Sequence, residues 1–234
     1  LVVTISTSQR RDFAWLRRHV PADAKVFIRD MSSGLPMLAL MGPKSRALLQ
    51  AASPADFSNE AFPFGTSKEI DLGYARVRAS RVTFVGELGW EIYMPAEFAA
   101  HVFDRLTEAG EPFGLRHGGF FALNSLRMEK GYRHWGHDIG EEDTPIQAGL
   151  SFAVAYDKPG GFIGRDALLK QKELGVPNRR LVQFALTEAD APLLYHQEPI
   201  WSGNKITGSI TSGAYGHRIG ASLGMGYVEN DGGV

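Results

Sequence analysis

The chain has 234 residues, of which 44% are hydrophobic and 22% are charged, close to the averages for soluble globular domains. A chain of this length and composition can bury a core of its own, which excludes an intrinsically disordered protein. Lys and Arg number 25 and Asp and Glu number 26. No net positive field therefore attracts nucleic acid or an anionic membrane, and we expect neither as a partner.

The sequence contains no cysteine, which excludes disulfide frameworks, cysteine-ligated zinc, iron–sulfur clusters and thiol nucleophiles. We expect a reducing compartment: the cytoplasm, or the mitochondrial matrix if the source is eukaryotic. No stretch reaches the ~20 apolar residues of a membrane span, and no signal-peptide pattern is present. Because the chain begins at Leu1 rather than Met and ends in a turn-like segment, we expect a fragment of a longer polypeptide.

Helical periodicity and terminal residues predict five helices. The clearest begins after Pro95, where apolar residues recur at helical spacing up to the stop at Gly110. The predicted helices cover residues 9–19, with Ser8 as N-cap, and 44–52, 95–110, 120–130 and 165–173. Apolar or alternating runs predict strands at residues 1–6, 25–30, 36–41, 73–85, 90–94 and 150–156.

Near residue 178 the pattern changes to strands alone. Strand-like runs occupy residues 181–186, 199–201, 205–211 and 221–228, with a hairpin turn at 202–204. The predicted fold class is α+β, with a mixed domain over residues 1–177 and an all-β domain over residues 178–234.

The densest group of polar and aromatic residues lies at 127–138, at the C-terminal end of the fourth predicted helix and beyond it. Tyr132 and Trp135 are suited to stacking on a planar heterocycle, and Arg127 and Arg133 to pairing with carboxylates. Loops on a rigid scaffold commonly carry binding residues, although composition alone favours a solvated turn here.

Other patterns are less specific. His134 and His137 are three residues apart, but the intervening Trp–Gly disfavours a helix and no metal signature is present, so we expect no metal site. Glu87 and Glu91 flank a Gly–Trp turn, where a carboxylate either accepts two parallel N–H bonds from an amidine-like edge or is simply exposed at a strand end. Glycine-rich nucleotide loops and the hydrolase Gly-x-Ser-x-Gly pattern are absent.

Four blocks of sequence, in order along the chain, point to a known family. They are residues 82–93 (VTFVGELGWEIY), 123–131 (LNSLRMEKG), 144–150 (TPIQAGL) and 210–228, which includes ITSG and LGMGYV. Together they resemble the glycine-cleavage T-protein (aminomethyltransferase) family over essentially the whole chain. The segments GELGWE at 86–91 and GYRHW at 131–135 are similar to the folate-binding C-terminal half of dimethylglycine and sarcosine dehydrogenases.

This resemblance implies a T-protein-like folate-binding domain, incomplete at its N-terminus, followed by an antiparallel β-barrel domain, incomplete at its C-terminus. It implies tetrahydrofolate as cofactor, with FAD confined to an upstream flavin domain of the same polypeptide. That flavin domain would convert a small N-methyl amine into an iminium, and the folate module would capture the one-carbon unit as 5,10-methylenetetrahydrofolate. The family's catalytic aspartate would lie upstream of Leu1. The resemblance therefore assigns no catalytic residue to this chain, which alone is expected to be inactive.

The resemblance also implies residues for the pterin ring, which would lie in the central channel of the mixed domain. Glu87 or Glu91 would accept the pterin amino and N3 hydrogens. Tyr93, Tyr132 or Trp135 would line the space around the ring system.

For the glutamate tail of folate, the resemblance implies Arg127 or Arg133. The sequence departs from the family pattern just before these residues, where Leu123 and Asn124 stand in place of an Arg–Asp pair.

Two other kinds of function fit the same resemblance. One is a glycine-cleavage T-protein proper, or another folate-dependent demethylase, with a different methyl donor. The other is a catalytically inactive module that retains the fold for binding or for a structural purpose.

Overall fold

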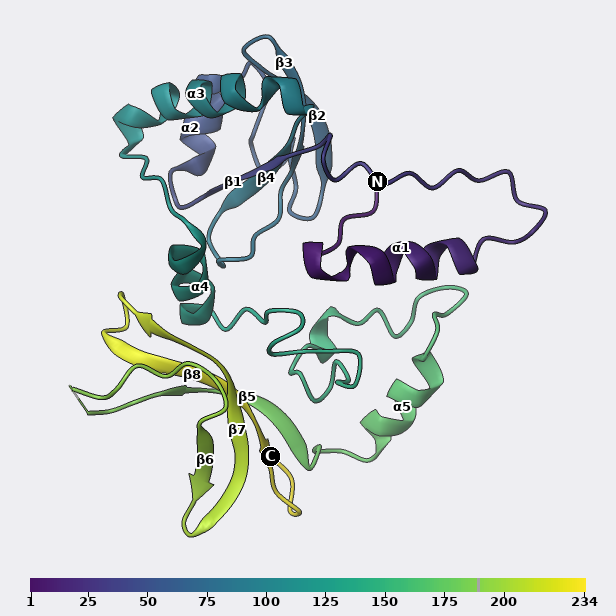
Figure 1. The fold of residues 1–234 in the computed structure, drawn as a ribbon, viewed down its shortest axis with the longest axis vertical. Coiled ribbons are helices and arrows are strands. Elements are labelled where there is room, and N and C mark those ends of the chain that lie inside the picture. The colour runs from purple at the N-terminus through teal and green to yellow at the C-terminus, as the bar shows by residue number, and fades with distance from the viewer. Residues whose placement is uncertain (189) are drawn as a thin grey trace. The chain divides into compact units, whose positions relative to one another are not determined.

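The chain forms two compact units in the computed structural model, which describes residues 1–188 and 190–234 (Figure 1). The first unit comprises Leu1–Thr83 and Glu87–His117, and the second comprises Phe84–Gly86 and Gly118–Val234. Each unit combines helices with a four-stranded antiparallel sheet. The predicted α+β class is therefore confirmed.

The sheet of the first unit has the strand order β1-β4-β3-β2. Its strands are β1 (Met37–Met41), β2 (Ser67–Leu72), β3 (Ala75–Ser80) and β4 (Gly89–Tyr93). Helices α2 (Ser45–Ala52) and α3 (Ala99–Gly110) share one hydrophobic core with this sheet. The remaining helical segments of the unit are α1 (Gln9–Arg18) and 3₁₀ turns at Ser6–Ser8, Ala96–Phe98 and Glu111–Phe113.

The alternation of side chains along β4 separates this core from the opposite face of the sheet. Trp90 and Ile92 are both 0% exposed. Trp90 meets Phe57 and Phe62 edge-on, with ring centroids 5.5 and 5.9 Å apart, a geometry that aromatic quadrupoles favour. Because successive side chains of a strand point to opposite faces, Glu91 lies on the face away from the core.

The sheet of the second unit has the strand order β5-β8-β7-β6. Its strands are β5 (Arg179–Ala185), β6 (Pro199–Ser202), β7 (Lys205–Gly216) and β8 (Ala221–Glu229). Helix α4 (Phe120–Glu129) packs on β7 and β8, and its Met128 joins Leu223 and Met225 in a second core. The unit also contains α5 (Arg165–Glu173) and a 3₁₀ turn at Ser151–Ala153.

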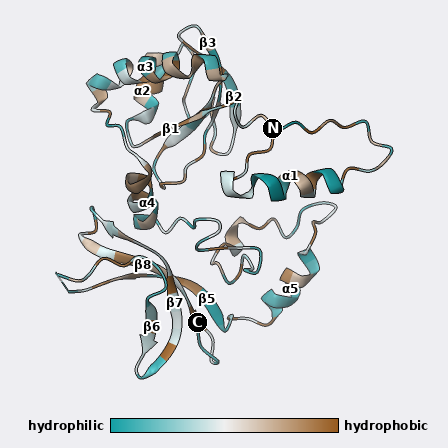
Figure 2. Cartoon of the chain, in the orientation of Figure 1, coloured by the Kyte–Doolittle hydropathy of each residue, from teal (hydrophilic) through white to brown (hydrophobic). Residues whose placement is uncertain are grey.

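Helices α1 and α5 are surface elements. Neither contains a buried residue, and Figure 2 shows both as predominantly hydrophilic. Within the described residues, no helix combines the length and the apolar character that crossing a membrane requires.

All five predicted helices are present, but three predicted strands are wrong. Residues 1–6, 25–30 and 150–156 contain no strand, and 3₁₀ turns occupy parts of the first and the last. A strand requires a partner for its backbone N–H and C=O groups, and the described residues offer none at these positions. Ser8 precedes α1 but makes no side-chain cap hydrogen bond.

Strand β2 was not predicted. It pairs along its whole length with β3, and it buries Ile70 and Leu72 on the core side. Lys68, Glu69 and Asp71 interrupt its apolar pattern, because they occupy the exposed positions.

We expect Ile92→Ala to lower the free energy of unfolding by about 2–5 kcal/mol, because it leaves a cavity beneath the sheet. Glu91→Gln, one residue away on the other face, should change the free energy of unfolding by less than about 1 kcal/mol. Chemical denaturation of the two variants measures both quantities. Equal losses would contradict the assignment of the two faces.

Candidate functional site

Glu91 and Tyr93 form a polar pair on the outward face of the first sheet. The Tyr93 hydroxyl donates a hydrogen bond to Oε2 of Glu91, and both residues are half-buried. This bond restricts the carboxylate to one orientation. A carboxylate has two oxygens and about four acceptor positions, so it retains capacity for further N–H donors.

The side chains next to Glu91 in the sheet are small. The register pairs Glu91 with Ala39 of β1 on one side and Ser80 of β3 on the other. Ser80 in turn faces Ser67 of β2, with their hydroxyl oxygens 3.0 Å apart. Glu91 is thus flanked across the sheet by the short side chains of Ala39 and Ser80.

Charged side chains continue this face toward β2. Arg78 pairs with Glu69, with Nη2 and Oε1 2.9 Å apart, and Arg76 with Asp71, with Nη1 and Oδ1 3.3 Å apart. Solvent-exposed pairs of this kind add little stability. We call the face that carries Glu91, Tyr93 and these pairs the polar face of the first sheet.

Tyr93 acts as a hydrogen-bond donor over the whole physiological range. Partial burial raises the pKa of its phenol well above the usual value, and the neighbouring Glu91 carboxylate raises that pKa further. Both effects disfavour the phenolate. The proton therefore remains available to hold the carboxylate.

Glu87, the other candidate carboxylate, lies in the connection between β3 and β4 and is half-buried. The structure places Glu91, and not Glu87, on the sheet face shared with Tyr93. Sequence spacing alone left this choice open.

The remaining predicted site residues belong to the second unit, where a loop follows α4. The helix ends at Glu129 and is closed by Gly131, whose φ of 66° is readily adopted by glycine. The amide of Gly131 bonds the Met128 carbonyl and the amide of Tyr132 bonds the Arg127 carbonyl, the pairing of a Schellman cap. This cap fixes where residues 132–139, which we call the ligand loop, leave the helix.

Arg127 is enclosed inside the second unit, with its side chain 3% exposed. Its Nε donates to Oδ1 of Asn124 at 2.8 Å, and its Nη1 donates to the Tyr132 carbonyl at 3.0 Å and to Oδ2 of Asp138 at 2.5 Å. A buried guanidinium requires such partners. The structure thus gives Arg127 an internal role, and its predicted contact with folate stays a prediction.

Arg133 is more accessible than Arg127. Its Nε donates to the Ala148 carbonyl at 3.1 Å and its Nη1 to the Gly131 carbonyl at 2.6 Å. Burial is the main cause that lowers the pKa of its guanidinium, but arginine remains charged in proteins. Because a guanidinium has five N–H donors, Arg133 retains donors for a ligand carboxylate.

Tyr132 and Trp135 are half-buried in the ligand loop. In the same loop, the rings of His134 and His137 lie with their centroids 4.7 Å apart. Burial lowers the pKa of His134, and the nearby His137 and Arg127 lower it further. Among the described residues, no three His, Cys, Asp or Glu side chains gather as metal ligands do.

Two residues tied to this loop were not predicted as site residues. Asp138 is completely buried, and Thr211 of β7 donates to it from 73 positions further along the chain. No local sequence pattern joins residues so far apart, so only the fold reveals the contact.

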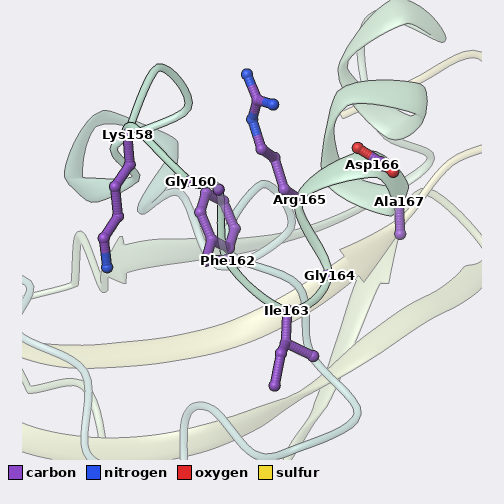
Figure 3. A pocket seen from close by; sticks show the side chains of 9 residues that line it. Lys158, Gly160, Phe162, Ile163, Gly164, Arg165, Asp166 and Ala167 are labelled. Carbon is purple, nitrogen blue, oxygen red and sulfur yellow. The ribbon is translucent and has the colours of Figure 1, made fainter.

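A hollow of about 690 Å³ lies elsewhere in the second unit, at the start of α5 (Figure 3). It is lined by residues 158 and 160–167. The hollow is open, and Ile163 on its rim is 90% exposed. None of the predicted site residues lines it, so it does not enter the assignment of the site.

The sequence matches two family descriptions. Residues 1–158 match the GCVT N-terminal domain, and residues 179–233 match the glycine cleavage T-protein C-terminal barrel domain. These matches confirm the predicted succession of a mixed domain and a barrel-type domain. The boundary placed between residues 177 and 178 stays a prediction.

Individual relatives agree with these matches. A 4-methylaminobutanoate oxidase (formaldehyde-forming) of Paenarthrobacter nicotinovorans is 46% identical over 99% of this chain, and the mitochondrial sarcosine dehydrogenase of Homo sapiens is 40% identical over 87%. The crystal structure of the glycine cleavage system aminomethyltransferase T of Bartonella henselae covers 95% of this chain, with a TM-score of 0.70 and 26% identity.

The chain corresponds to a part of each relative. It spans 28% of the oxidase, 22% of the sarcosine dehydrogenase and 58% of the aminomethyltransferase chain.

We expect Glu91→Gln to lower the pKa of the Tyr93 phenol, because the neutral amide no longer opposes the phenolate. The pKa should stay above the ordinary value, since burial is the larger cause. Carbon-13 NMR of the labelled tyrosine Cζ, titrated from neutral to alkaline pH, measures this change. An unchanged pKa of Tyr93 would contradict the hydrogen bond to Glu91.

Proposed function

Because the chain belongs to the glycine-cleavage T-protein family, we propose that it is the tetrahydrofolate-binding, aminomethyltransferase-like part of a dimethylglycine/sarcosine dehydrogenase-type enzyme. The reaction is the passage of a one-carbon unit from a small N-methyl amine, oxidised to its iminium, to tetrahydrofolate. The observation that carries the proposal is the Glu91 carboxylate, oriented by Tyr93 on the polar face of the first sheet.

The pterin edge and this carboxylate have complementary hydrogen-bonding groups. The 2-amino group and N3 of the pterin present two adjacent N–H donors in one plane. A carboxylate accepts two parallel N–H bonds, and such charge-assisted pairs are short and directional. The residues paired with Glu91 across the sheet, Ala39 and Ser80, have short side chains, which favours the approach of a flat ring to this carboxylate.

The chain contributes binding and orientation. Bound tetrahydrofolate supplies the amine that accepts the one-carbon unit. The residues of this chain would fix the position of that amine, and most of the acceleration of such a step comes from positioning and electrostatics. Tyr132, Arg133 and Trp135 are further proposed contacts to folate.

The chemistry itself is proposed to depend on the rest of a longer polypeptide. An upstream flavin domain with FAD would oxidise the N-methyl amine, and the catalytic aspartate of the family would lie before Leu1. On this proposal the chain binds folate but does not turn over alone. The cytoplasm or the mitochondrial matrix is the proposed location.

The T-protein proper, or another folate-dependent demethylase, is the second candidate, because the solved aminomethyltransferase shares the fold with a TM-score of 0.70. The sequences favour the first candidate, since the oxidase and the sarcosine dehydrogenase are 46% and 40% identical to the chain. An adjoining flavin domain in the full gene would support the first candidate, and a lipoyl-carrier partner the second.

Calorimetric titration with 5-formyltetrahydrofolate tests the proposed site. Glu91→Gln should weaken binding about tenfold to hundredfold, the usual range for the loss of hydrogen bonds to a charged group. Glu69→Gln, on the same polar face but paired with Arg78, is the matched control and should leave the affinity unchanged.

The same titration of Glu87→Gln decides between the two candidate carboxylates. A loss in Glu87→Gln with full affinity in Glu91→Gln would move the pterin to Glu87. Absence of binding both by the chain and by a polypeptide extended upstream would contradict the folate proposal and favour the inactive module.

A second titration tests the proposed tail contact. Arg133→Gln should weaken binding of 5-formyltetrahydrofolate about tenfold, because it removes a charge-assisted partner of the tail carboxylates. It should leave binding of a tetrahydropterin without a glutamate tail unchanged. Equal losses for the two ligands would contradict a role specific to the tail.

A further inference from the structure

We infer that Asp138 is a positioning residue, which holds the ligand loop in the conformation that presents Tyr132, Arg133 and Trp135. The inference rests on the proposed function, because it concerns the same site. Asp138 itself is 0% exposed and does not contact the ligand. It acts through the backbone and side chains that it binds.

Asp138 receives hydrogen bonds from three separate parts of the second unit. Its Oδ2 accepts from Nη1 of Arg127 in α4 at 2.5 Å and from the backbone amide of His134 at 2.8 Å. Its Oδ1 accepts from the Thr211 hydroxyl of β7 at 2.6 Å. A buried carboxylate is tolerated when it is paired and hydrogen-bonded in this way.

These bonds act on the segment that carries the predicted contacts. The bond from the His134 amide folds the ligand loop back on itself, four residues before Asp138. Arg127, held by Asp138, also binds the Tyr132 carbonyl. The backbone on each side of Arg133 is therefore attached to the same ion pair.

The backbone of β7 is adapted to this contact. The pairing of β7 with β8 shifts between Ile210 and Ser212, which face Gly226 and Met225, so Thr211 is the extra residue of a β-bulge. Bulges redirect a side chain from the regular alternation. The hydroxyl has one proton, which goes to the charged Asp138 oxygen at 2.6 Å rather than to the Met225 carbonyl at 3.0 Å.

Thr211 offers the cleanest test, because Asp138→Asn would leave Arg127 buried without its counter-charge and can prevent folding. Thr211→Val removes the hydroxyl and keeps the shape. Thr211→Ser restores the hydroxyl. Thr207→Val is the matched control on β7, since the Thr207 hydroxyl binds the Ile200 carbonyl, away from the loop.

The experiment measures amide hydrogen exchange of residues 132–139 and the affinity for 5-formyltetrahydrofolate in the same variants. In Thr211→Val we expect exchange of the loop amides, above all His134, to speed up about tenfold and folate binding to weaken, while the β5–β8 amides keep their protection. Thr211→Ser should restore both quantities, and Thr207→Val should change neither.

Outcomes other than the expected ones overturn the inference or the proposed function. Unchanged exchange of the loop amides in Thr211→Val overturns the positioning role. Faster exchange with undiminished folate affinity shows that the contact serves stability alone, and it overturns the inference as well. Failure of the unsubstituted chain and of a longer polypeptide to bind folate contradicts the proposed function. The exchange data still report separately on whether the hydrogen bonds of Asp138 hold the ligand loop.

Discussion

The alternation of side chains along β4 is the constraint on which the candidate site depends. Trp90 and Ile92 are completely buried on one face, so Glu91 and Tyr93 must lie on the other. A slip of one residue would place a carboxylate in the core and an indole in water. The hydrophobic core therefore fixes which side chains lie on the polar face of the first sheet.

In the second unit a buried ion pair holds the backbone around the candidate residues, whereas in the first unit the candidate residues lie on a strand of the sheet. The ligand loop of the second unit has little regular secondary structure. The hydrogen bonds that Asp138 accepts from Arg127 and from the His134 amide hold the loop backbone in place of strand pairing. A charge pair of this kind stabilises less than its Coulomb attraction suggests, because both groups lose their hydration. Its value here is geometric, since it requires one arrangement of the backbone around Arg133.

The sequence could reveal elements whose pattern is local. Helix α3 was predicted from its periodicity, and β4 from a short run between a glycine turn and a proline. The sequence could not reveal which strands pair. Strand β2 was missed because its outward positions are charged. Residues 25–30 have the pattern of a strand but no partner strand among the described residues. The same limit applies to the site. Glu91, Tyr93 and Arg133 came from motifs, whereas the enclosure of Arg127 and the contact from Thr211 to Asp138 depend on long-range packing.

The central claim is that Glu91 holds the pterin edge of folate. The most direct test is a crystal structure of the chain, or of a longer polypeptide that contains it, with 5-formyltetrahydrofolate bound. The account predicts the pterin 2-amino group and N3 within about 3 Å of the two Glu91 oxygens, with Tyr93 still bonded to the carboxylate. A pterin bound to a different carboxylate, with Glu91 and Tyr93 open to solvent, would contradict it.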